Sequence, residues 1–105
     1  MNPIARLNDG RHVLLNRRSR THADIIVNDD GELSTVGHIR TETKPRKNAA
    51  TTQALTMRYG RGVARSMGFG DREAHQVFNA RGRRIGHDYD RINDAALALV
   101  RSVTL

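Results

Sequence analysis

The residues of this chain best suited to acid–base chemistry or to metal binding are five histidines: His12, His22, His38, His75 and His87. None of their spacings matches H-E-x-x-H or a zinc finger, and the absence of cysteine excludes thiolate ligands, thiol catalysis and disulfides. One local cluster remains, the segment GHDYD at 86–90, whose histidine and two aspartates can bind a cation or form a general base. The same aspartates can instead cap a following helix. We favour this capping role and predict no metal site.

Glycine-rich loops that bind phosphate cofactors are not expected either. The G-x-G at residues 68–70 lacks a third glycine, and the G-x-G at residues 60–62 lacks the lysine of a P-loop. The sequence therefore predicts no cofactor.

Histidine and arginine together also suit a metal-independent ribonuclease, which needs a general base, a general acid and cations that stabilise a pentavalent phosphorane. His12 and His38 fall on predicted strands, and His75 and His87 flank a predicted hairpin. Histidines scattered over strands are more often surface or half-buried residues without a chemical role. We therefore expect a protein without catalytic activity and keep an RNA-cleaving toxin as an alternative. The sequence does not decide whether any histidine is catalytic.

The basic residues give a stronger signal. The 105 residues contain 18 Lys or Arg against 11 Asp or Glu, which gives a formal net charge of +7 and a pI near 11.2. Sixteen of the 18 cations are arginine, whose planar fork suits phosphate, although the codons of a GC-rich genome are the simpler explanation of that ratio. A surface of this charge attracts polyanions. The predicted nucleic-acid-binding residues lie in a basic loop, on a helix and at a hairpin tip: Lys44, Arg46, Lys47, Arg58, Arg61, Arg65, Arg81, Arg83 and Arg84.

Length and composition narrow the class of protein further. A chain of 105 residues predicts a single domain over 1–105. No apolar run approaches the roughly 18 residues of a membrane span, and residues 1–15 lack the apolar region of a signal peptide, so we expect a cytoplasmic protein without membrane contact. Only four aromatic residues are present, and we expect at least two of them in the core. This argues against a platform for stacking bases and favours duplex or structured nucleic acid.

Three segments predict β-hairpins, because each joins two apolar stretches by a turn that contains Asn and ends in Gly: 4–15, 25–36 and 76–85. In the second and third, the spacing x-N-x-x-G predicts a type I turn with the glycine in the bulge position. Gly37 interrupts the alternation between Leu33 and Ile39, which predicts a bulge there. Residues 41–48, TETKPRKN, predict a basic loop because Pro45 is unsuited to the interior of a strand or helix.

Two helices are expected. Asn48 is a suitable N-cap for a long helix over residues 49–67. The arginines of this helix lie roughly opposite an apolar face, and we expect that face to pack on the sheet. That apolar face consists of Leu55, Tyr59, Val63 and Met67. Glycines at 60 and 62 weaken the helix by about 1 kcal/mol each and mark either close packing on the sheet or a break near Tyr59, between which the sequence does not decide. Residues 71–78 fit a helix or a strand, whereas the spacing of apolar residues over 92–103 predicts a short C-terminal helix.

The predicted element order, ββββ-α-ββ-α, describes an α+β domain whose mainly antiparallel sheet is built from hairpins, with one long helix packed on it and a short C-terminal helix. From the charge we predict a small basic protein of bacterial, phage or plasmid origin that binds the backbone of DNA or RNA. The hairpin edges favour, as an alternative, a protein-interaction module or inhibitor that docks on an acidic host protein, or a module that docks on a second copy of itself. The sequence distinguishes neither DNA from RNA nor a selected basic surface from a compositional one.

Overall fold

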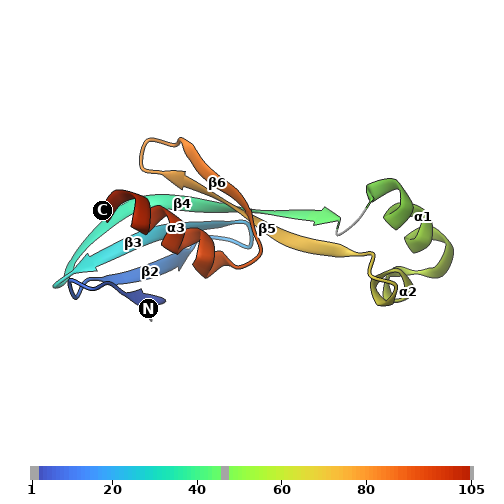
Figure 1. Ribbon diagram of the computed structural model, residues 1–105, viewed down its shortest axis with the longest axis horizontal. Coiled ribbons are helices and arrows are strands. Elements are labelled where there is room, and N and C mark those ends of the chain that lie inside the picture. Colours follow the sequence, from blue (N-terminus) through green and yellow to red (C-terminus); the bar gives the residue numbers. More distant parts are fainter. Residues whose placement is uncertain (1–2, 46–47, 105) are drawn as a thin grey trace. The chain divides into compact units, whose positions relative to one another are not determined.

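The computed structural model describes residues 3–45 and 48–104. Within these ranges the chain is an α+β protein with a six-stranded sheet and three short helices (Figure 1). The strands lie in the sheet in the order in which they occur along the chain. The pairs β1–β2, β2–β3, β3–β4 and β5–β6 are antiparallel. The elements are β1 (Ala5–Arg6), β2 (His12–Arg17), β3 (His22–Asp29), β4 (Glu32–Pro45), α1 (Ala49–Tyr59), α2 (Arg61–Ser66), β5 (Asp71–Asn79), β6 (Arg84–Tyr89) and α3 (Ile92–Thr104).

The contacts within the chain divide it into two compact units. One comprises residues 1–42 and 74–105, and we call it the sheet unit. The other comprises residues 43–73, which include α1 and α2, and we call it the helical unit. Strands β4 and β5 contribute residues to both units, so the helical unit is an insertion in the sequence between the two halves of the sheet unit.

The core of the sheet unit lies between one face of the sheet and α3, which crosses that face in Figure 1. Alternate residues of the strands point inward, as a half-buried sheet requires, and α3 presents residues spaced three and four apart. The buried cluster consists of Val13, Ile25, Val27, Ile39, Val77, Ala95, Ala96, Leu99 and Val100. The short C-terminal helix is therefore the element that covers the sheet.

All three predicted hairpins are present, and their turns differ in type. In the third, the Gly82 N–H donates to the Asn79 carbonyl (2.9 Å) and Gly82 has a φ of +83°, as predicted for a type I turn with a bulge glycine. In the second, Asp29 pairs with Glu32, and both intervening residues have a positive φ (51° and 92°). Two positive φ angles define a type I′ turn, so the predicted type I turn was wrong there.

The predicted bulge near Gly37 is confirmed. Ile25 pairs with Gly37 and Ile26 pairs with Thr35, which leaves Val36 as the extra residue of β4. A Cβ atom at Gly37 would collide with the side chain of Leu99 and with the carbonyl group of Phe78. Glycine at this position therefore lets α3 approach the sheet closely.

The predicted long helix over 49–67 was wrong, because the chain breaks it at Gly60. Asn48 does cap α1, since its Oδ1 accepts the Thr51 N–H (3.0 Å). Gly60 then adopts a φ of +92°, which glycine tolerates and a right-handed helix cannot contain, and α2 begins at the next residue. The expected burial of the apolar face fails as well, because Tyr59, Val63 and Met67 are exposed.

The predicted loop over residues 41–48 was also wrong in part, since β4 continues to Pro45. Proline lacks only its own N–H, and at the last residue of a strand that donor is not needed. Residues 71–78, for which the sequence allowed helix or strand, belong to strand β5.

Candidate nucleic-acid interface

The nine predicted binding residues are divided between the two units. Lys44, Arg58, Arg61 and Arg65 belong to the helical unit, whereas Arg81, Arg83 and Arg84 belong to the sheet unit. The other two, Arg46 and Lys47, lie outside the described residues. Lys44 is half-buried in β4, and the other six described residues are exposed.

The break at Gly60 also divides the predicted arginine stripe of the helical unit. Arg58 is in the last turn of α1, and its guanidinium carbon lies 5.3 Å from the centre of the Tyr59 ring, a cation–π distance. Arg61 and Arg65 lie one turn apart on α2. The three exposed arginines are thus presented by two short helices.

Arg61 and Arg65 line the same pocket of the helical unit, with a volume of about 320 Å³. Its other lining residues are Pro45, Thr52, Gln53, Thr56, Met57, Gly70 and Asp71. The hydroxyls of Thr52 and Thr56 donate to carbonyl oxygens one turn earlier in α1, at 2.8 and 2.7 Å, and so are already used. The two guanidinium groups are therefore the groups in this pocket best suited to bind an anion. The pocket lining also contains one carboxylate, that of Asp71.

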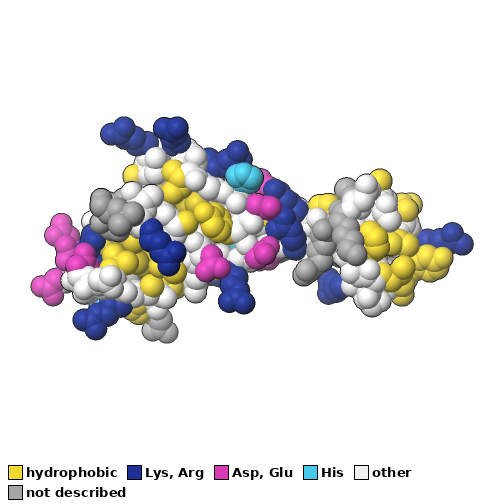
Figure 2. Space-filling model, viewed as in Figure 1, with side chains coloured by type: hydrophobic (Ala, Val, Ile, Leu, Met, Phe, Trp, Pro, Cys, Tyr) yellow, Lys and Arg dark blue, Asp and Glu magenta, His cyan; other side chains and the backbone are white. Residues whose placement is uncertain are grey.

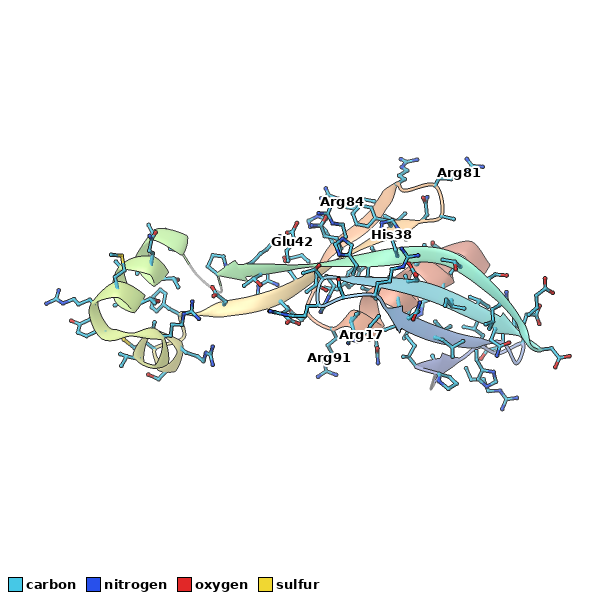
Figure 3. All side chains as sticks on the ribbon, turned by 180° about the vertical axis from the view of Figure 1, so that it is seen from behind. Arg17, His38, Glu42, Arg81, Arg84 and Arg91 are labelled. Atoms are coloured by element: carbon cyan, nitrogen blue, oxygen red, sulfur yellow. The ribbon has the colours of Figure 1, made fainter. Side chains whose placement is uncertain are left out.

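The arginines of the third hairpin surround a rigid turn. Asn79 Oδ1 accepts hydrogen bonds from the backbone N–H groups of Arg81 and Arg83, both at 3.0 Å, which leaves both guanidinium groups outside the turn's hydrogen-bond network. In Figure 3, Arg81 lies at the hairpin tip, whereas Arg84 lies farther along the sheet, near Glu42 and His38. Arg84 donates to Gln76 Oε1 (3.4 Å), and Gln76 in turn donates to Glu42.

The sheet face opposite α3 carries a stacked pair of rings that the sequence did not predict. His38 of β4 and Phe78 of β5 stack with their ring centres 4.8 Å apart and their planes 7° from parallel. Phe78 pairs with Arg84 of β6, and His38 pairs with Asp24 of β3. The expectation of at least two aromatic residues in the core was wrong, because Tyr89 alone of the four packs against the buried cluster within the described residues.

Two of the five histidines line one pocket. His22 and His38 share a pocket of about 500 Å³ in the sheet unit with Arg18, Ser19, Ala23 and Asp24. His75 is instead buried at 5% exposure, with its Nδ1 hydrogen-bonded to Thr41 Oγ1 (2.8 Å). Among the described residues, no three His, Asp or Glu side chains form a group that could hold a metal ion.

The sequence contains one signal for this pocket, in the alternation of residues along β3. His22 and Asp24 have the opposite parity to Ile25 and Val27 in β3, so a strand must place the two polar residues on the face opposite the core. Which residues of β2 and β4 join them depends on register, and the bulge at Val36 shifts that register by one residue.

The two units differ in how far their arginines are paired with carboxylates. Two salt bridges lie in the sheet unit, Arg11–Asp9 (2.7 Å) and Arg18–Asp24 (2.6 Å). The hydrogen bond from the Arg11 side chain lowers the pKa of Asp9 below its ordinary value and raises the pKa of Arg11. The exposed arginines of the helical unit have no carboxylate partner among the described residues.

Comparisons with known proteins add no assignment: no protein family matches the chain, and neither curated proteins nor solved structures give a match. Within the described ranges, the helices are too short or too polar to span a bilayer.

Proposed function

We propose that this chain is a small, non-enzymatic, nucleic-acid-binding protein of bacterial, phage or plasmid origin, located in the cytoplasm, that grips the phosphate backbone of DNA or RNA. The observation that carries the proposal is the charge of the helical unit. Residues 43–73 contain seven Lys or Arg and two Asp or Glu, a net +5 in a segment of 31 residues, and no acidic residue occurs from 44 to 70. Phosphate oxygens bound there would meet little competition from carboxylates.

Exposure and pairing support the same proposal. Arg58, Arg61 and Arg65 are solvent-exposed and make no salt bridge within the described part of the chain. An unpaired guanidinium needs no internal partner to be broken before it binds a phosphate, and its planar fork can donate two hydrogen bonds. The hairpin arginines Arg81 and Arg83 offer a second cationic group on the sheet unit.

The test is the salt dependence of binding. The affinity for a 20-base-pair DNA duplex and for the matching RNA duplex is measured by fluorescence anisotropy over a series of salt concentrations. Each lost phosphate contact reduces the slope of log K against log salt by about 0.9 on B-DNA. We expect the variant R58Q/R61Q/R65Q to lose about 3 units of slope and to bind both duplexes more weakly.

The matched control removes the same charge from the sheet unit. The variant R17Q/R20Q/R101Q also loses three exposed arginines and should keep most of the wild-type slope. Equal losses in the two variants would show that net charge alone governs binding, and no binding near 50 mM salt would refute the proposed function.

A protein partner is the second candidate, because four large apolar side chains of the helical unit are exposed: Met57 (80%), Tyr59 (51%), Val63 (44%) and Met67 (52%). Figure 2 shows hydrophobic side chains gathered on the visible face of this unit beside Lys and Arg side chains. Such a surface fits an acidic protein with apolar contact residues, or a second copy of this chain. Sedimentation velocity of the wild type and of M57S/M67S checks the second copy, and a monomer at all concentrations would exclude it.

A further inference from the structure

The sheet unit contains a pocket whose chemistry differs from that of the exposed arginines. It lies beside His38, has a volume of about 500 Å³, and is lined by residues of β3, β4 and the β2–β3 connection. The strand order β3-β4-β5 places Phe78 on one side of His38 and Asp24 on the other. Phe78 covers one face of the imidazole, and His38 also lines this pocket, on the side of its β3 neighbour Asp24.

Asp24 is the carboxylate that lines the pocket. Its side chain is only 13% exposed, and its Oδ2 accepts a hydrogen bond from the Nε of Arg18 at 2.6 Å. No buried side-chain oxygen among the described residues lacks a hydrogen-bond partner, so the other oxygen of Asp24 is open to solvent. A carboxylate only accepts hydrogen bonds, and this one can therefore receive a ligand that brings N–H donors.

The rim of the pocket is polar and cationic. The Arg18 side chain is 70% exposed, and its bond to Asp24 uses Nε, so the terminal nitrogens of the guanidinium are not engaged by that bond. His22 is held in place by its Nδ1, which is hydrogen-bonded to Thr21 Oγ1 (2.8 Å). The pocket therefore combines an imidazole ring, a mostly buried carboxylate and an exposed guanidinium.

We propose that this pocket binds an unpaired nucleobase, stacked on His38 as a third ring of the His38–Phe78 stack, with its Watson–Crick edge toward Asp24. Unpaired bases are commonly stacked on aromatic side chains, histidine included, and read along that edge. Guanine is the base that fits, because it alone presents two neighbouring N–H donors, N1 and N2, to an acceptor-only carboxylate. Arg18 is placed to contact the adjoining phosphate.

This inference rests on the proposed function and changes its substrate class, from duplex to a single strand that contains guanine. The sequence favours a core role for the aromatic residues and hence no stacking platform, whereas Phe78 lies outside the buried cluster and stacks with His38.

The experiment compares fluorescein-labelled RNA dodecamers by anisotropy at one salt concentration. The probes are twelve uridines, the same strand with three isolated guanines, and that strand with inosine, which lacks the N2 amino group, in place of guanine. A matched duplex is the fourth probe. We expect the guanine strand to bind about tenfold more tightly than uridine, with inosine between them.

Three variants locate the binding to the pocket. H38A should weaken binding of the guanine strand roughly 5- to 100-fold, the range expected for loss of one stacked base. H38F keeps an aromatic face and should retain most of the affinity. D24N should reduce the preference for guanine over uridine to near onefold, and H87A, which alters an exposed histidine of β6 outside the pocket, should change nothing.

The outcomes separate this inference from the proposed function. Duplex binding with a normal salt slope, together with equal affinity of wild type and H38A for the guanine strand, would overturn the pocket and leave the proposed function intact. No binding of any probe would remove both. Cleavage of the RNA that is lost in H22Q would assign the pocket to phosphodiester chemistry and overturn its role as a base-binding site.

Discussion

The sheet unit and the helical unit use their apolar residues and their charges in opposite ways. Of the buried hydrophobic residues in the described part of the chain, Ala64 alone belongs to the helical unit, whereas the sheet unit holds the entire core cluster. Charge has the reverse distribution, with a net +5 over the 31 residues of the helical unit and +2 over the 74 of the sheet unit. Buried apolar side chains and net positive charge are therefore concentrated in different parts of the chain.

The largest effect on stability is expected in the core of the sheet unit. Leu99 is fully buried between α3 and the sheet, and replacing it by alanine should lower the free energy of unfolding by about 2–5 kcal/mol. Urea denaturation followed by circular dichroism measures this loss. The companion variant M57A removes a side chain that is 80% exposed in the helical unit and should change stability by about 0.5 kcal/mol or less. Similar losses in the two variants would contradict the comparison.

A smaller effect is expected at the start of α1. Asn48 Oδ1 accepts the Thr51 N–H, and N48A should cost about 1 kcal/mol in the stability of this helix because the cap is lost. Amide hydrogen exchange resolves the effect by region. Faster exchange over residues 49–59 with unchanged exchange in β2 and β3 is the expected pattern, and uniform acceleration in both units would show that they unfold together.

The smallest effect concerns the pH dependence of the sheet unit. The hydrogen bond from Arg11 lowers the pKa of Asp9, so the ionised carboxylate stabilises the folded state above the ordinary value of 3.8, and this contribution is lost as the pH falls through the lower, folded-state pKa. Because the pair is exposed, D9N should lower the Tm only slightly at pH 7. Thermal melts measure the Tm of the wild type and of D9N at pH 7 and in acid. The difference between the two Tm values should disappear in acid, and a difference that grows in acid would contradict this assignment.

Local chemistry made several parts of the fold predictable from sequence. Asn79 and Gly82 form the expected type I turn, Asn48 caps a helix, and the parity break near Gly37 marks a real bulge. In the turn and in the helix cap, the residues that predict the structure also make the hydrogen bonds that form it. The type I′ turn at Asp30 was missed because Asp tolerates both negative and positive φ, and the strand pairing that selects between them is not local.

The errors concern which surfaces are covered. Helical spacing places Tyr59, Val63 and Met67 on one side of a continuous helix, but it does not show that another element buries that side. The sequence marks Gly60 as a cost to the helix but does not fix its backbone conformation, which has a φ of +92° in the structure. The pocket beside His38 depends on strand order and on register across the bulge, which a residue pattern within one strand does not contain.

The position of α3 has a consequence for the order of folding during synthesis. Val13 and Ile25 of the first strands are buried with Leu99 and Val100, which the ribosome adds more than 70 residues later. The hairpins β1–β2 and β3–β4 can pair early, but their apolar face has no cover until α3 is made, whereas α1 and α2 need only local contacts. The apolar face of the nascent sheet therefore stays uncovered until α3 is made, and covering it has the entropic cost of closing this long loop.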